Sequence, residues 1–564
     1  MLPEKRKRLF QVPKSLKIFP EIYNRKEEKM KIKTLCAHID CSRNAVMKKE
    51  SLKDFLKILS EMGYNAVMLY TEDTYEIPEY PFFGYMRGRY TAEDLKEIDE
   101  YAASLGMELI PCIQLLGHLE QALKWDFLPK ENTDIILPDD PKTYEFVDRA
   151  FAALSGCIKS RRIHVGLDEA FGLGSGALLR KNGYESPISI IKRHLSKILP
   201  IAEKYGYTML AWSDMFFRDW NDGGYWIEKK TVPSEVVDSV PDNVIPVYWD
   251  YYSLDYNRYD AMLSNHKQLT DELWFAGAAW GWRGMIPYNN FTINTMTASL
   301  DACESNECEN IMVCLWGDDG NECSRYAHLP SLYFIAKYAN GEKDMAKIKA
   351  GFEEMFGIAF DDYMKIDEPN RPGNPKFGLC DMNSSRYMLY SDYFNGFKDV
   401  MAKEDEAAAY PAYAKELSEI ADKLSPLFAP LFKSAAALCD VLSVKYALGI
   451  KTRKAYQSGD KAELLRLAKE DYTALLTLIP EYHKAFKAQW DKENRPSGFD
   501  LQDLRLGGLI QRTKSCMKRL IDYAEGRLDK IDELEVELLP MLTPSYGKWR
   551  SGKYMFTPNV FEGI

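Results

Sequence analysis

The chain has 564 residues, of which 46% are hydrophobic and 28% charged, a composition typical of folded globular proteins and long enough for two or three domains. Its formal net charge of -11 argues against a nucleic-acid partner, because phosphate backbones are bound by clustered Lys and Arg. The sequence has no apolar run of about 18 residues, so no membrane-spanning helix and no membrane partner are predicted.

The N-terminal segment, residues 1–30, is too short for a domain and is predicted to be an extension. It is basic at residues 4–8 but has no continuous apolar stretch and no small-residue cleavage site, so we expect no secretion signal and a cytoplasmic protein. The 11 cysteines are odd in number and scattered, which favours reduced thiols. Cys303, Cys308, Cys314 and Cys323 lack the spacing of a zinc site and no His lies among them, so neither metal nor cofactor is expected.

From residue 31 to 345, apolar strand-like runs alternate with amphipathic helical stretches. The expected strands are 32–40, 66–71, 108–115, 163–168, 208–213, 244–250, 273–280 and 311–316. The expected helices include 51–62, 91–105, 142–158, 189–204, 257–269 and 292–305. Eight such units predict an α/β fold, a closed (β/α)8 TIM barrel with its working face at the C-terminal ends of the strands.

Helix-boundary signals support these units. Ser51 and Thr91 are residue types that cap helix N-termini, and Thr91 with Asp94 resembles a capping box. Gly63 and Gly106 follow their helices as C-terminal cap residues do. Each glycine is followed closely by the next expected strand.

The pattern changes after the barrel. Residues 346–376 include a stretch rich in Pro, Gly and Asn and are predicted to be a linker region. Residues 377–564 then show helical spacing at 386–401, 413–456, 461–492 and 500–525, with few β-branched runs. They predict an α-helical C-terminal domain.

The strongest chemical signal is at 161–176. Apolar and polar residues alternate from 163 to 168, and Asp168 and Glu169 end this expected strand before a glycine-rich loop. Two carboxylates at the mouth of a strand end are how many hydrolases assemble acid-base chemistry, although a surface turn is the alternative interpretation. The loop lacks the full spacing of a phosphate-binding loop.

Every expected strand is followed by side chains that suit a sugar ligand. Aromatic rings pack on the C–H face of a pyranose, and carboxylates and Arg bind its hydroxyls. In chain order these residues are Arg43, Glu72, Asp73, His118, Asp168, Glu169, Trp212, Asp214, Trp249, Asp250, Tyr251, Tyr252, Trp280, Trp282, Trp316 and Asp318. The sequence therefore predicts a sugar pocket on this rim.

These segments resemble, in order, those of glycoside hydrolase family 20, the β-N-acetylhexosaminidases. The run from His164 to Glu169 is similar to the family's His-Xaa-Gly-Xaa-Asp-Glu motif. Five further segments are similar to family motifs, and they contain Arg43, Glu72 with Asp73, His118, Trp212 with Asp214, and Trp316 with Asp318. The helical C-terminal region resembles that of a compact bacterial subgroup, some members of which form dimers.

One departure concerns the tyrosine that binds the substrate's acetamido oxygen in this family. The place after the seventh strand, where the family has that tyrosine, here contains Trp280 and Trp282. Tyr251, Tyr252 and Tyr288 are the candidates to replace it.

The resemblance implies an exo-acting enzyme that hydrolyses terminal non-reducing GlcNAc or GalNAc from an oligosaccharide or glycoconjugate, with no cofactor. It implies that Glu169 is the general acid and that Asp168 orients the 2-acetamido group. The oxygen of that group would attack the anomeric carbon to form an oxazolinium ion, with net retention of configuration.

The resemblance also implies the other roles. Arg43 and Asp318 would bind sugar hydroxyls, and the remaining contacts would come from Trp212, Trp249, Tyr251, Tyr252, Trp280 and Trp316. Glu72 and His118 would support Glu169, and His164 would lie inside the barrel.

Two other functions remain open from sequence. An enolase-type barrel would hold Mg²⁺ at Glu72, Asp168 and Asp318. A non-catalytic barrel would only bind a sugar. GlcNAc or GalNAc, any linkage, and a monomer or a homodimer are all compatible with these patterns.

Overall fold

The computed structural model describes residues 32–318, 320–371 and 384–539. Eight parallel strands close into a barrel in sequence order, which confirms the predicted (β/α)8 fold. They are β1 (Thr34–Asp40), β2 (Ala66–Tyr70), β3 (Glu108–Cys112), β4 (Arg162–His164), β5 (Thr208–Trp212), β6 (Val244–Trp249), β7 (Trp274–Ala278) and β8 (Asn310–Leu315). Pairing of β1 with β8, in a register that sets Leu35 opposite Ile311, closes the sheet.

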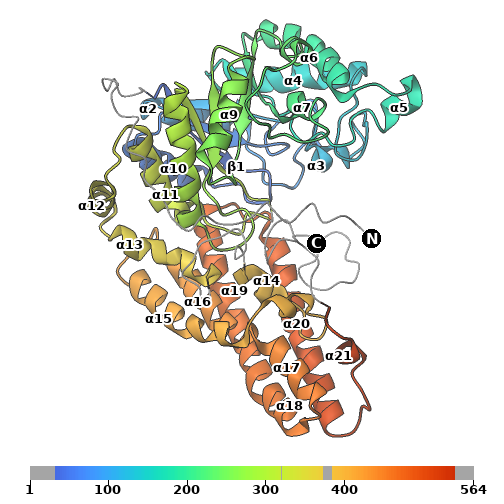
Figure 1. Cartoon of the computed structure of the whole chain (residues 1–564), viewed down its shortest axis with the longest axis vertical. Coiled ribbons are helices and arrows are strands. Elements are labelled where there is room, and N and C mark those ends of the chain that lie inside the picture. The colour runs from blue at the N-terminus through green and yellow to red at the C-terminus, as the bar shows by residue number, and fades with distance from the viewer. Residues whose placement is uncertain (1–31, 319, 372–383, 540–564) are drawn as a thin grey trace.

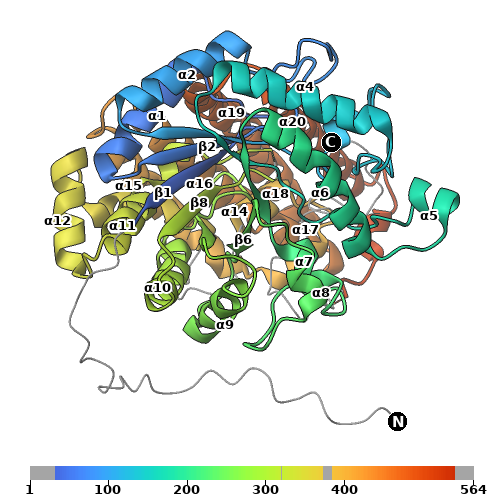
Figure 2. The same cartoon turned by 90° about the horizontal axis from the view of Figure 1, so that it is seen from above.

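Helices surround these strands (Figure 2). The long ones are α1 (Lys49–Met62), α2 (Ala92–Ser104), α4 (Pro141–Cys157), α6 (Pro187–Lys204), α9 (Tyr256–His266), α10 (Asn289–Ser305) and α11 (Leu329–Ala339). Short helices α3 (Glu120–Leu123) and α5 (Ala177–Asn182) lie in strand-to-helix connections, and α7 (Asp214–Arg218) and α8 (Ser234–Val237) are the helices between β5 and β6. The rim at the C-terminal ends of the strands is therefore the elaborated face of the barrel.

Helix α1 shows how the sequence specifies this layer. Leu52, Phe55, Leu56 and Leu59 recur at helical spacing and are fully buried against the barrel. Gly63 then adopts a left-handed φ of 113° and ends the helix, as predicted.

The predicted caps of α1 and α2 have different outcomes. Thr91 and Asp94 form the expected capping box of α2. Ser51, however, is not the cap of α1, which begins after Lys48. The Ser51 hydroxyl instead donates to the carbonyl of Lys492 at 2.7 Å, because the helical region packs against this end of the barrel.

Strand β4 is shorter than predicted. It ends at His164, and Gly166 and Leu167 follow with φ values of 72° and 77°, which is left-handed backbone. The expected extended run to residue 168 is therefore wrong beyond His164. The alternation of apolar and polar residues continues through a turn that it does not reveal.

The region after the barrel is helical, as predicted. Its helices are α12 (Met345–Phe356), α13 (Phe360–Tyr363), α14 (Ser384–Tyr390), α15 (Tyr410–Ala421), α16 (Ala429–Lys445), α17 (Leu448–Gln457), α18 (Lys461–Leu467), α19 (Thr473–Glu493), α20 (Phe499–Ala524) and α21 (Asp532–Glu535). In Figure 1 the barrel occupies one end of the long axis and helices α14 to α21 the other.

Several predicted boundaries in this region need correction. The predicted linker region contains α12 and α13, and the expected helix 413–456 is divided into α15, α16 and α17. Pro426 and Pro430 explain the first break, since proline cannot continue a helix from its preceding turn. The predicted extension 1–30 and residues 372–383 lie outside the described residues.

The helical region meets the barrel at the rim formed by the C-terminal ends of the strands. The N–H of Lys48 donates to the carbonyl of Glu493 at 2.9 Å, and Met47 forms a β-bridge with Asn494. Glu322, which follows β8, is buried between Arg386 and Arg505 of the helical region. Within the described ranges, no helix is long and apolar enough to cross a membrane.

Candidate active site

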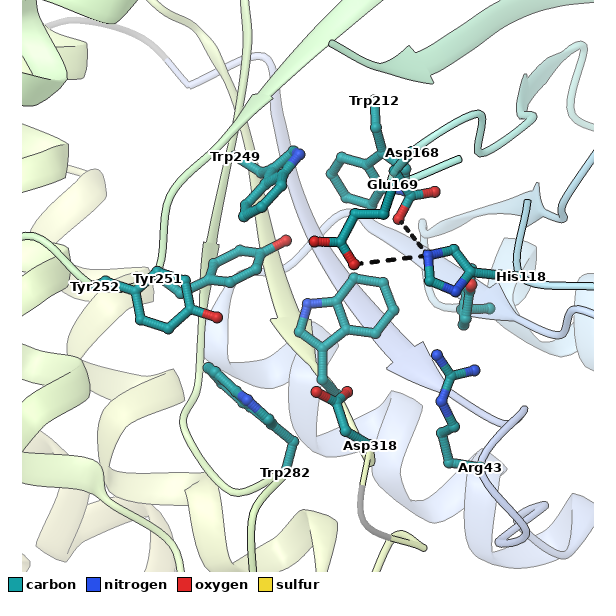
Figure 3. A pocket seen from close by; sticks show the side chains of 12 residues that line it. Arg43, His118, Asp168, Glu169, Trp212, Trp249, Tyr251, Tyr252, Trp282 and Asp318 are labelled. Carbon is teal, nitrogen blue, oxygen red and sulfur yellow. Dashed lines mark ion pairs between the residues drawn. The ribbon is translucent and has the colours of Figure 1, made fainter. Parts of the chain in front are cut away.

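A cavity of about 560 Å³, including its open mouth, lies at the C-terminal ends of the strands (Figure 3). Every strand or the loop after it contributes to its wall. The lining residues are Arg43, Tyr70, His118, Asp168, Glu169, Trp212, Trp249, Tyr251, Tyr252, Trp282, Trp316 and Asp318. The structure thus brings most of the predicted site residues together around one pocket.

The turn that follows β4 orients the two adjacent acids. Gly166 has positive φ, and a Cβ atom there would lie 1.8 Å from the Gln114 side-chain oxygen. Leu167 and Glu169 also have positive φ, which is strained for residues with side chains. Strand alternation alone predicts that the two acids diverge, but this turn directs both carboxylates toward His118.

His118 contacts both acids. Its Nε2 atom lies 3.2 Å from Asp168 Oδ2 and 3.9 Å from Glu169 Oε2 (Figure 3). Burial of His118 opposes its charged form, but the Asp168 carboxylate outweighs burial and raises the pKa of His118 to about 10. The imidazolium is thus the cation that faces this acid pair.

Asp168 is held as an anion. It accepts a 2.8 Å hydrogen bond from Gln114 Nε2 in addition to its contact with His118. Burial opposes ionisation of the carboxyl, but the His118 charge and hydrogen bond outweigh it and lower the pKa of Asp168 to about 2.

Glu169 has the opposite character. Burial, together with the charges of Asp168 and Asp214, raises the pKa of Glu169 to about 7. Asp214 is fully buried, accepts from the Glu169 backbone N–H at 3.1 Å and from Arg218 Nε at 2.9 Å. The pocket therefore holds one carboxyl that exchanges a proton near neutral pH beside one that stays ionised.

Arg43 is fixed by Glu72. The two form a close ion pair, and the Tyr70 hydroxyl donates to Glu72 Oε1 at 2.9 Å. No hydrogen bond joins Glu72 directly to Glu169 in the described residues; Glu72 contacts Arg43 and Tyr70, and the Tyr70 hydroxyl accepts from Gln114, which donates to Asp168. The charge of Glu72 nevertheless favours the His118 cation.

The aromatic wall differs from the prediction at one position. Trp280 does not line the cavity, because its indole N–H donates to the backbone carbonyl of Tyr251 at 2.7 Å and its ring stacks behind Trp282 at 3.8 Å. Trp282 therefore presents the lining surface. Tyr251 packs edge-on against Trp282 at 5.8 Å and stacks with Trp249, with ring centroids 5.4 Å apart.

His164 and Trp274 do not line the pocket. His164 is fully buried, accepts from the Gly166 N–H at 3.2 Å and packs 4.4 Å from the Trp212 ring. Trp274 lies at the other end of the barrel, where its ring contacts Arg162.

Sequence reasoning missed Gln114, Tyr70 and Arg218. Gln114 had a readable signal, since it is an isolated amide in the apolar run of the third strand and such buried polar groups need partners. Tyr70 also had one, since it is the last residue of β2 and strand ends meet at the rim. Arg218 had none, because it lies at the end of the short helix α7, away from any strand end.

The side chains that the enolase-type alternative would use as metal ligands do not form a group among the described residues. Among residues 32–318, 320–371 and 384–539, no three His, Cys, Asp or Glu side chains form a group that could hold a metal ion. The carboxylates of Glu72, Asp168 and Asp318 therefore do not converge as the enolase-type alternative requires.

Comparisons with known proteins agree with this geometry. Residues 36–265 match the model of the glycosyl hydrolase family 20 catalytic domain, and residues 361–552 match the glycoside hydrolase 20C C-terminal domain. The chain is 27% identical to hexosaminidase D of Bos taurus over 43% of its length and 69% of that protein. It is 26% identical to the human hexosaminidase D over 44% of its length and 51% of that protein.

Solved structures are also similar to this chain. The family 20 exo-β-N-acetylglucosaminidase of Vibrio harveyi, in complex with N-acetylglucosamine, aligns with a TM-score of 0.45 and 17% identity. The alignment covers 60% of this chain and 58% of that one.

Proposed function

The chain belongs to glycoside hydrolase family 20, and from this premise we propose that it is an exo-acting β-N-acetylhexosaminidase that releases terminal GlcNAc or GalNAc with retention of configuration. The observation that carries the proposal is the adjacent pair Asp168 and Glu169, whose pKa values are driven in opposite directions at the same pocket. One group is suited to donate a proton and the other to remain an anion.

In the first step, Glu169 gives its proton to the glycosidic oxygen as the bond from that oxygen to the anomeric carbon breaks. The oxygen of the substrate's own 2-acetamido group attacks the anomeric carbon and forms a cyclic oxazolinium ion. In the second step, Glu169 accepts a proton from a water molecule whose oxygen attacks the anomeric carbon. This attack breaks the bond to the acetamido oxygen and opens the oxazolinium ring. The protein supplies no nucleophile.

Asp168 acts on the acetamido group. Its carboxylate accepts the N–H of that group, which aims the acetamido oxygen at the anomeric carbon and stabilises the positive charge that develops. Gln114 and His118 hold the carboxylate in place, so little reorganisation is needed during the reaction.

Tyr251 is our choice among the three candidate tyrosines. It lines the cavity, it is packed against Trp249, and its hydroxyl points into the pocket in Figure 3. We assign this hydroxyl to the acetamido oxygen. Arg43 and Asp318, on the other side of the pocket, would bind the ring hydroxyls.

The test is hydrolysis of p-nitrophenyl N-acetyl-β-glucosaminide and the plain β-glucoside by the native chain, by Glu169→Gln and by Asp168→Asn. We expect cleavage of the acetamido substrate alone, reduced at least about 100-fold in both variants. Glu185→Gln, an acid on the same connection outside the pocket, is the matched control and keeps full activity.

Three outcomes would contradict the proposal. Cleavage of both substrates at similar rates would remove the role of the acetamido group. An α-configured first product in NMR would mean inversion. Binding of N-acetylglucosamine with no turnover would favour the non-catalytic alternative.

A further inference from the structure

Phe171 is an exposed aromatic residue beside the candidate general acid. Its side chain is 60% exposed, and its backbone N–H donates to the carbonyl of Glu169 two residues earlier. Single exposed aromatics are ordinary on protein surfaces. This one differs because a buried cation holds its ring in a defined place.

That cation is Arg218. Its guanidinium carbon lies 4.9 Å from the centroid of the Phe171 ring, within the range of a cation-π contact. The arginine is only 16% exposed and is anchored by Asp214 at 2.9 Å and by the Gly223 carbonyl at 3.0 Å. The exposed ring is thus braced from below by a fixed planar group.

The same guanidinium reaches the general acid. Arg218 Nη2 lies 4.0 Å from Glu169 Oε1. The carboxyl of Glu169, the guanidinium and the Phe171 ring therefore form one continuous surface that runs outward from the acid.

The position of the general acid indicates which part of the substrate lies against this surface. A general acid must contact the oxygen that joins the bound sugar to its leaving group. The leaving group therefore begins at the Glu169 carboxyl and extends toward solvent. Beside Glu169 Oε1, the carboxyl oxygen that does not face His118, lie Arg218 and the exposed Phe171 ring.

We propose that Phe171 binds the leaving-group sugar, whose pyranose ring stacks on the face of Phe171 that Arg218 does not cover. The inference rests on the proposed function and names the residue that recognises the leaving group when that group is a sugar. The C–H face of a pyranose packs on an aromatic ring, and the Arg218 cation behind Phe171 supports that ring.

The experiment compares two substrates that differ only in the leaving group. We would measure kcat/KM for N,N'-diacetylchitobiose, whose leaving group is a sugar, and for methyl N-acetyl-β-glucosaminide, whose leaving group is methanol. In Phe171→Ala the ratio of the two values is expected to fall about fivefold to tenfold, the size of one aromatic stacking contact. Phe171→Trp restores the ratio because it keeps an aromatic face.

Tyr184→Ala is the matched control. Tyr184 is an aromatic residue on the same connection and is 80% exposed, but no contact to the acid is found for it. Its removal should leave the ratio unchanged.

A ratio that stays at the native value in Phe171→Ala, or that falls equally in Tyr184→Ala, overturns the inference while leaving the proposed function intact. A native chain that cleaves neither substrate instead refutes the proposed function, and this site with it.

Discussion

Gln114 donates to Asp168 Oδ1 at 2.8 Å, and the oxygen of the same amide accepts the N–H of Leu167 at 3.2 Å. One buried side chain thus fixes both the carboxylate and the strained turn that carries it. A glutamate of the same shape is ionised at neutral pH and only accepts hydrogen bonds, so it could not donate to Asp168. Position 114 therefore requires an amide.

The first prediction concerns this amide. Gln114→Glu keeps the size of the side chain but sets a second negative charge against Asp168. We expect kcat with p-nitrophenyl N-acetyl-β-glucosaminide to fall about 100-fold or more, because the oriented anion is lost. Gln511→Glu, at an exposed position of helix α20, is the control. A native kcat in Gln114→Glu would show that the Gln114 amide does not orient the Asp168 carboxylate.

The second prediction concerns the turn itself. Gly166→Ala is expected to lower kcat about 100-fold, since the new methyl group would collide with Gln114, and Gln114 is held by its bonds to Asp168 and Tyr70. Gly183 also has a positive φ, of 81°, but a Cβ atom there would meet nothing within 4 Å, so Gly183→Ala is the control. The Gly183 variant introduces backbone strain without a collision. Equal losses of activity in Gly166→Ala and Gly183→Ala would refute the explanation by collision with Gln114.

The third prediction is the pH dependence. Glu169 must be protonated to act as an acid, and its pKa is raised to about 7. Asp168, with a pKa lowered to about 2, stays ionised throughout the working range. We therefore expect kcat/KM to be constant between about pH 4 and 6 and to fall tenfold per pH unit above about 7. An alkaline limb below pH 5 would contradict this assignment.

The fourth prediction is a shift of the alkaline limb of kcat/KM when Asp214 is replaced. The charge of Asp214 is one of the groups that raise the pKa of Glu169. Asp214→Asn removes that charge and frees Arg218 to act on Glu169 alone, and both effects lower the pKa of Glu169. The alkaline limb of kcat/KM should move to lower pH, while Glu185→Gln leaves it in place. A shift to higher pH would be inconsistent with these electrostatics.

The fifth prediction concerns stability. Glu322 is fully enclosed between Arg386, at 2.5 Å, and Arg505, at 2.7 Å. Glu322→Ala leaves two buried arginines without this partner, at a cost of about 3–5 kcal/mol. Asp491→Ala, which breaks an exposed pair with Lys487, should cost less than about 1 kcal/mol. Thermal melting distinguishes them, and equal midpoints would show that the Glu322 cluster does not stabilise the chain.

The sequence predicted the barrel because strand and helix periodicities differ and recur eight times. It also placed most of the pocket, since every strand of a barrel ends on the same rim. Trp280 shows the limit of that rule. Trp280 and Trp282 are both buried aromatics after β7, and only the hydrogen bond from Trp280 to the Tyr251 carbonyl decides which ring faces the cavity.

The turn at Gly166 shows a second limit. Its residues continue the alternation of strand β4, so pattern alone extends the strand through them. The turn is held by Gln114, more than fifty residues away, whose side-chain oxygen accepts the Leu167 N–H and leaves no room for a Cβ atom at residue 166. Contacts of that range leave no trace in local periodicity.

The junction between barrel and helices has a consequence for recombination. Val46, Met47 and Lys48, just after Arg43, pair backbone to backbone with residues 493–495. A chimera that joins this barrel, up to residue 345, to the helical region of a relative would keep the Arg43 loop. That loop would then pair with the relative's segment in place of residues 493–495. Productive chimeras are therefore expected to be those that inherit residues 493–495 together with the barrel.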